Sequence, residues 1–200
     1  MPRVNNEQFY AASLRKHGIS AQGVQWRSVE NQRIRFDQIA SMISGKGETL
    51  RIADAGCGFG DLYRYLLPIV GERLHYIGLD SYSVMAEIAR KRTQGEIRCL
   101  DVLHDSLPRA DYYVCSGALN ILTPYESHRF IRRCFEASER GFVFNFLEGS
   151  DESETYNYLH ARTIEALARD LNARCVLKRG YLKDDCTAAF YKVPQTKTAT

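Results

Sequence analysis

The stretch between residues 49 and 67 constrains the fold more than any other part of this 200-residue chain. A short apolar run over 49–54 is followed by a turn containing Gly56, Gly58 and Gly60, and then by a helical pattern over 61–67. Glycine adopts backbone conformations that other residues avoid, and it lets a ligand lie directly against the main chain. A strand, such a turn and a helix together predict a βα unit with a binding site at the carboxyl end of the strand.

Short apolar runs alternate with helical patterns along the rest of the chain. We expect strands over 74–79, 97–100, 111–116 and 141–146, and helices over 61–67, over 83–92, from Thr123 onward and around 164–171. Thr123, Pro124 and Glu126 have the spacing of a capping box with proline at the first helical position. This alternation is typical of an α/β fold with a largely parallel sheet. The last two runs, 174–179 and 188–193, lack a helix between them and should pair antiparallel.

The first 48 residues carry no strand pattern. Apolar residues from Val29 to Ile43 recur at helical spacing, and Gly45 follows as a stop signal. We therefore predict two parts: a helical cap over residues 1–48 and an α/β domain over residues 49–200.

Composition excludes several classes of protein. A net charge of +3 is too small to indicate a nucleic-acid partner by itself. The six cysteines form no Cys-x-x-Cys pair and have no zinc spacing, so we expect reduced thiols and no metal site. No apolar stretch approaches the roughly 20 residues that span a bilayer, and the N-terminus lacks the apolar run of a signal peptide. These features predict a cytoplasmic protein without a membrane partner.

Polar residues follow several predicted strands at the edge where a ligand would bind. Asp54 ends the first strand, and Asp80 ends the second, where a carboxylate can accept hydrogen bonds from both hydroxyls of a ribose. Asp101 follows the third strand and Ser116 the fourth. A surface turn or a helix cap would explain either Asp80 or Asp101 alone. Only their joint placement with the glycine turn indicates a site.

The stretch 54–61, with Asp54 two places before a Gly-x-Gly-x-Gly run, resembles motif I of the class I S-adenosylmethionine (SAM)-dependent methyltransferases. A dinucleotide site would instead have Gly-x-Gly-x-x-Gly. The resemblance covers roughly residues 48–193. It implies a seven-stranded, mostly parallel sheet of order 3-2-1-4-5-7-6 with strand 7 antiparallel, helices on both faces and an N-terminal helical cap. It also implies SAM as cofactor and S-adenosylhomocysteine (SAH) as product.

The resemblance also implies which residues bind the cofactor. These are Asp54, Gly56, Cys57, Gly58, Gly60, Asp80, Ser81, Asp101, Val102 and Ser116. In small members with helical caps, an aromatic residue and an arginine often reach the methionyl end of the cofactor. We therefore predict that Trp26 covers the site and that Arg35 or Arg33 pairs with the cofactor carboxylate. In the alternative interpretation, Trp26 anchors the cap to the core and the arginines face solvent.

A SAM-dependent methyltransferase with a small-molecule acceptor is the function that this resemblance implies. The stretch 115–120 lacks the Asn/Asp-Pro-Pro-Tyr/Phe motif of enzymes that methylate DNA bases and glutamine, and the chain has no added basic domain for RNA. Asn120 is a candidate to face the acceptor pocket. Tyr156, Tyr158 and His160 are candidates to line its mouth, with packing as the alternative role for the tyrosines, and we assign no catalytic residue or oligomeric state. The alternatives are an RNA or protein methyltransferase, a non-catalytic SAM-binding module, and a nicotinamide-dependent oxidoreductase.

Overall fold

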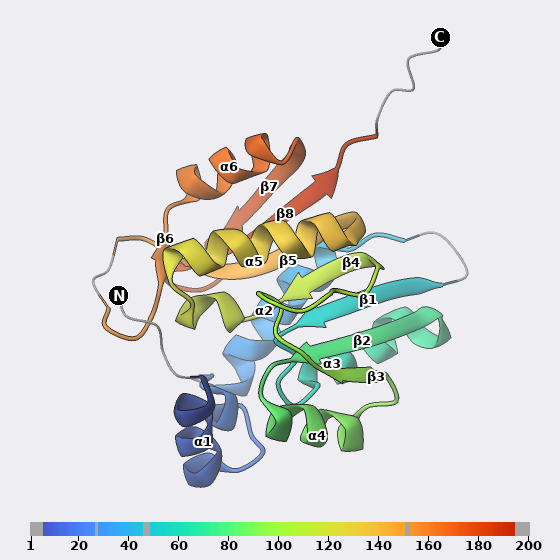
Figure 1. The fold of residues 1–200 in the computed structure, drawn as a ribbon, viewed down its shortest axis with the longest axis vertical. Coiled ribbons are helices and arrows are strands. Elements are labelled where there is room, and N and C mark those ends of the chain that lie inside the picture. The colour runs from blue at the N-terminus through green and yellow to red at the C-terminus, as the bar shows by residue number, and fades with distance from the viewer. Residues whose placement is uncertain (1–5, 27, 46–48, 151–152, 195–200) are drawn as a thin grey trace.

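A twisted sheet runs through the computed structural model, which describes residues 6–26, 28–45, 49–150 and 153–194 (Figure 1). Its strand order is β3-β2-β1-β4-β5-β8-β7, and a short strand, β6, pairs with β5 outside this path. The strands are β1 (Leu50–Ala55), β2 (Leu74–Asp80), β3 (Glu96–Cys99), β4 (Ala110–Cys115), β5 (Ser138–Glu148), β6 (Tyr158–Leu159), β7 (Ala173–Arg179) and β8 (Asp185–Lys192). β1 to β5 pair in parallel, whereas β8 is antiparallel to both of its neighbours.

This topology confirms the predicted fold class. When β6 is left out, the order is the predicted 3-2-1-4-5-7-6 with an antiparallel strand between β5 and the edge. Strand β6 was not predicted, because a two-residue strand is too short to show an alternating pattern.

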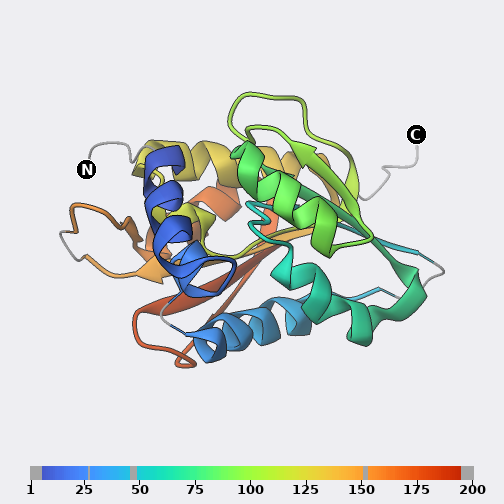
Figure 2. The same cartoon turned by 90° about the horizontal axis from the view of Figure 1, so that it is seen from below.

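Helices cover both faces of the sheet (Figures 1 and 2). The helices are α1 (Asn6–His17), α2 (Val29–Met42), α3 (Asp61–Val70), α4 (Ser83–Arg92), α5 (Pro124–Ala137) and α6 (Ala161–Asp170), with 3-10 turns η1 (Gln22–Val24), η2 (Gly71–Arg73) and η3 (Ala118–Ile121). In Figure 1, α5 and α6 lie in front of the sheet and α2 and α3 lie behind it. Among the described helices, none is long and apolar enough to cross a membrane.

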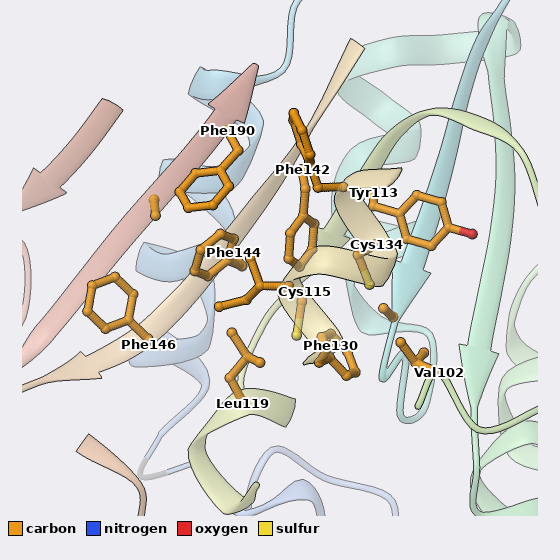
Figure 3. Packing of buried hydrophobic residues seen from close by; sticks show 14 of the residues in the cluster. Val102, Tyr113, Cys115, Leu119, Phe130, Cys134, Phe142, Phe144, Phe146 and Phe190 are labelled. Atoms are coloured by element: carbon orange, nitrogen blue, oxygen red, sulfur yellow. The ribbon is translucent and has the colours of Figure 1, made fainter. Parts of the chain in front are cut away.

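Aromatic residues of β5 and β8 fill the core on the α5 and α6 side (Figure 3). Side chains alternate along a strand, so Phe142, Phe144 and Phe146 share one face while Val143 faces α2. The Phe142 and Phe144 rings are stacked with centroids 4.7 Å apart, and Phe190 meets Phe144 edge-on at 5.4 Å. Burying each such side chain contributes about 1.5–3 kcal/mol.

The N-terminal helices have two different roles. Phe36, Ile39 and Met42 of α2 pack with Ile52 and Val114 of the sheet, so α2 belongs to the main core. Figure 1 shows α1 at the edge to which the arrowheads of the parallel strands point. The helix predicted from Val29 to Ile43 is confirmed by α2. The division between cap and domain stays a prediction, because residues 46–48 lie outside the described part of the chain.

The capping box that begins α5 is present as predicted. The Thr123 hydroxyl accepts a hydrogen bond from the Glu126 N–H at 3.3 Å, and the Glu126 carboxylate accepts one from the Thr123 N–H at 3.0 Å. We expect Thr123→Ala to lower the free energy of unfolding by about 1 kcal/mol, because a backbone donor loses its partner. Urea unfolding checks this, with Thr123→Ser as the control that keeps the hydroxyl. Equal stability of the two variants would contradict the cap.

Candidate active site

A pocket opens at the carboxyl ends of the parallel strands, where α1 also lies. It contains about 1270 Å³ of unoccupied space, part of it open to solvent. Eleven of the twelve predicted site residues line it: Trp26, Arg35, Asp54, Gly56, Cys57, Gly58, Asp80, Ser81, Asp101, Val102 and Ser116. Gly60 is the exception. Residues from six separate stretches of sequence therefore meet at one site.

The glycine turn leaves β1 with a left-handed backbone. Gly56 has φ +83°, and a Cβ atom there would lie 2.6 Å from the Ala118 Cβ. The turn is held from behind, because the Gly56 and Cys57 N–H groups donate to the Leu79 carbonyl at 2.8 and 3.0 Å. Gly60 precedes α3 at φ +76°, and its Cβ would lie 2.4 Å from Thr93 Cγ2. Gly60 therefore allows close packing of α3 rather than lining the pocket.

Asp80 is the last residue of β2 and lines the pocket. Its carboxylate accepts hydrogen bonds from the Gly58 and Tyr82 N–H groups, both at 2.9 Å. Burial raises the pKa of Asp80 to about 6, although the two N–H groups act in the opposite direction. A carboxylate has about four acceptor positions, so Asp80 keeps capacity for further donors.

Asp54 is a second buried carboxylate, only 2% exposed. The Tyr76 hydroxyl donates to it at 2.6 Å. Burial raises the pKa of Asp54 to about 7, and the Tyr76 hydrogen bond lowers it, while the negative charges of Asp80 and Asp61 raise it further. Like charges in a desolvated site disfavour ionisation, so this site favours a cationic ligand.

The pocket lining as a whole is acidic. Among its described residues, four are aspartates (Asp54, Asp61, Asp80 and Asp101) and one, Arg35, is a cation. Asp61 is the first residue of α3 and forms an ion pair with Arg92 at 2.8 Å. The described residues contain no group of three or more His, Cys, Asp or Glu side chains that could hold a metal ion.

Asp101 stabilises the loop after β3. One oxygen accepts the Leu103 N–H at 2.8 Å, and the other lies 2.9 Å from His104 Nδ1. These contacts are those expected of a residue that stabilises a surface turn. Asp101 also lines the pocket, beside Val102 and Leu103.

Ser116 is hydrogen-bonded to a buried polar network that was not predicted from the sequence. Ser116 donates to Asn145 at 2.9 Å, and Asn145 donates to Thr187 at 2.6 Å. The hydroxyls of Thr187 and Tyr181 lie 2.7 Å apart. Asn145 and Thr187 face each other across β5 and β8 and are fully buried. The signal was present in the sequence, since Asn145 interrupts an otherwise apolar strand.

The two cap residues touch each other at the pocket wall. The Arg35 guanidinium lies 4.7 Å from the centroid of the Trp26 ring, and Trp26 also packs edge-on against Phe36. Arg35 is 8% exposed and forms an ion pair with Asp185. Its Nε–H has no hydrogen-bond partner among the described residues. Arg33 is exposed.

Helix α1 contributes two residues that the sequence analysis did not single out. Phe9 and Tyr10 line the pocket. Burial, followed by the negative charge of Asp80, raises the pKa of Tyr10, so its phenol stays protonated. No motif marks these residues, because their role depends on where α1 lies.

The raised pKa of Asp54 predicts how stability depends on pH. The folded-state pKa of Asp54, about 7, lies above the unfolded value near 4. The contribution of Asp54 to stability is therefore fully present below about pH 4 and is lost as the pH rises through 7. Asp54→Asn should change the free energy of unfolding of the ligand-free protein more favourably at pH 8 than at pH 5. We expect the difference between the two changes to be at least about 1 kcal/mol. Urea unfolding at both pH values measures this. The exposed Asp170→Asn should change stability equally at both, and the same result for Asp54→Asn would refute the prediction.

Several known proteins resemble this chain in sequence or in fold. A family model described as "Methyltransferase domain" matches residues 52–141. A search of curated proteins gives no significant match. The solved structure of magnesium protoporphyrin IX methyltransferase from Synechocystis PCC 6803 with bound SAM has a TM-score of 0.66 at 16% identity, covering 96% of this chain and 86% of that one.

Two further solved structures share the fold. Human N-acetylserotonin methyltransferase in complex with SAM has a TM-score of 0.69 at 16% identity, covering 94% of this chain and 60% of that one. An O-methyltransferase family protein from Burkholderia thailandensis has a TM-score of 0.73 at 12% identity, covering 95% of this chain and 63% of that one. Residues 52–141 therefore match the methyltransferase-domain family, and the described chain has the fold of these SAM-bound methyltransferase structures.

Proposed function

We propose that this protein is a SAM-dependent methyltransferase that transfers a methyl group to a small-molecule acceptor. One observation carries the proposal: four aspartates and a glycine turn converge on a single pocket at the carboxyl ends of β1 and β2. SAM carries a sulfonium, an ammonium and a carboxylate, so its net charge is positive. An acidic pocket attracts such a cofactor and repels an anionic one.

The same charges argue against a nicotinamide dinucleotide. A Rossmann-type site places the diphosphate at the N-terminus of the helix after the first strand, where free N–H groups bind it. Here Asp61 occupies the first position of α3 and lines the pocket. A diphosphate would therefore face a carboxylate, which favours SAM over NAD.

The residues fit SAM as follows. Asp80 and Ser81 would bind the ribose, and Asp101 with Val102 would contact the adenine. The turn formed by Asp54, Gly56, Cys57 and Gly58 would hold the methionyl moiety. Trp26 would cover it, and the Arg35 Nε–H, which has no other described partner, would donate to its carboxylate. Ser116 would lie near the methyl-transfer centre.

The chemistry asks little of this chain beyond positioning. The cofactor supplies an activated methyl group on a cationic sulfur. Alignment of an acceptor for in-line attack can contribute as much as ~7–11 kcal/mol. Phe9, Tyr10 and Trp26 line the pocket from the N-terminal segment and would shield a bound cofactor from water. Two structural neighbours are named for small molecules, a porphyrin and N-acetylserotonin, which supports an acceptor of that class here.

Calorimetric titration with SAM, SAH and NAD tests this proposal, and Asp80 provides the variant. We expect SAM and SAH to bind and NAD not to bind. Asp80→Ala should weaken SAH binding about 10- to 100-fold, because hydrogen bonds to a charged group are lost. Asp170→Ala, on the exposed surface of α6, is the matched control and should bind SAH normally. Binding of NAD alone, or of none of the three, would overturn the proposed function.

The role of Arg35 has its own test. Arg35→Lys keeps a positive charge beside Asp185 but removes the Nε–H donor. We expect about a tenfold loss of affinity for SAH and little change for 5′-methylthioadenosine, which lacks the amino-acid portion. Calorimetry with both ligands measures this. A similar loss for both, or for neither, would exclude contact between Arg35 and the cofactor carboxylate.

A further inference from the structure

A second pocket adjoins the candidate active site and shares its wall. We call it the outer pocket; it is lined by Ala12, Ser13, Lys16, His17, Gln22, Gln25, Trp26 and Tyr156. Gln25, Trp26 and Tyr156 also line the candidate active site, here called the inner pocket. The outer pocket is the more open of the two to solvent. A ligand long enough to occupy both pockets would therefore contact Trp26 and Tyr156.

The two pockets have opposite electrostatic character. The described lining of the outer pocket contains Lys16 and His17 and no carboxylate, whereas four aspartates line the inner pocket. Ser13, Gln22 and Gln25 complete a set of polar side chains around Lys16 and His17. Basic residues in the last turn of a helix also stabilise that helix. Arg15 belongs to the same turn but does not line the pocket, so Lys16 and His17 can be separated experimentally from that general effect.

Asn120 provides a second observation at the inner end. Its side chain lines the inner pocket, the residue is 9% exposed, and its buried Oδ1 accepts no hydrogen bond from the described residues. The Asn157 N–H donates to the Asn120 carbonyl at 2.7 Å, which places Asn120 beside the loop that carries Tyr156. A buried amide oxygen without a donor is unfavourable, so it favours a ligand that brings an O–H or N–H group.

We infer that the methyl acceptor occupies both pockets: its anionic group, a carboxylate or a phosphate, binds Lys16 and His17, and its nucleophilic O–H or N–H group lies against Asn120. A flat portion between the two ends would pack against the Trp26 and Tyr156 rings. This inference rests on the proposed function and specifies the substrate class.

The oxygen or nitrogen of the acceptor forms a bond to the methyl carbon while the carbon–sulfur bond breaks, and the electron pair of that bond stays on sulfur. The proton of the acceptor passes to water. Asn120 is a positioning residue, because an amide oxygen orients the O–H or N–H group without taking its proton.

The test uses the full-length, ¹⁵N-labelled protein saturated with SAH. Three probes share a phenol: 4-hydroxyphenylacetate, 4-hydroxybenzylphosphonate and the neutral 4-hydroxyphenylacetamide. Nuclear magnetic resonance titration follows the Trp26 indole N–H and gives each affinity. We expect at least one anion to bind about fivefold more tightly than the amide, as an exposed charge pair with Lys16 and a hydrogen bond from His17 would give. The two anions distinguish a carboxylate from a phosphate acceptor.

Variants assign this preference to residues. The double variant Lys16→Ala/His17→Ala should bind the preferred anion and the amide equally, while Arg15→Ala keeps the preference. For the inner end, 4-hydroxyphenylacetate should bind more tightly than phenylacetate, and Asn120→Ala should remove that difference.

Three results would overturn the inference: equal binding of the amide and both anions, an unchanged preference in the double variant, or no perturbation of Trp26 by any probe. Binding of SAH is measured first and separately. A failure of SAH to bind removes the proposed function itself, whereas normal SAH binding without an anion preference removes only this inference.

Discussion

The close approach of the turn after β1 to the segment after β4 is the constraint on which the rest of the site depends. Gly56 leaves room for Ala118, and its left-handed backbone carries the chain from the end of β1 into α3. The turn is tied to β2 through the Leu79 carbonyl and to Asp80 through the Gly58 N–H. Three neighbouring strand ends are therefore held in register by one short loop. A side chain at Gly56 would separate these parts and open the pocket that they enclose.

Buried carboxylates gathered in this way are costly to ionise. Asp54 and Asp80 both have raised pKa values, chiefly because burial disfavours their ionised forms. Hydrogen bonds from Tyr76 and from backbone N–H groups offset only part of that penalty. A ligand that brings positive charge and hydroxyl donors relieves the remainder. Residues that weaken the isolated fold are thus the ones that select its ligand, a common compromise at functional sites.

The sequence predicts features set by local chemistry, and here it predicts most of the sheet, the α5 cap and the glycine turn. Thr123 and Glu126 interact within one helical turn, so their spacing alone is informative. The ion pair between Arg35 and Asp185 and the Asn145–Thr187 contact join residues far apart in the chain. Such contacts depend on how α2, β5 and β8 pack, which no local pattern records. The same limit hid Phe9 and Tyr10 of α1.

The position of β8 affects the order in which parts of this protein can fold during synthesis. The penultimate strand lies at the sheet edge, and the last strand inserts between it and β5. Asp185 and Thr187 of β8 contact Arg35 and Asn145, so the support of the site is complete only when β8 is in place. A nascent chain that lacks β8 would expose the edge of β5 and lack part of its binding site. The contacts that support the site therefore form only after β8 has been synthesised and inserted between β5 and β7.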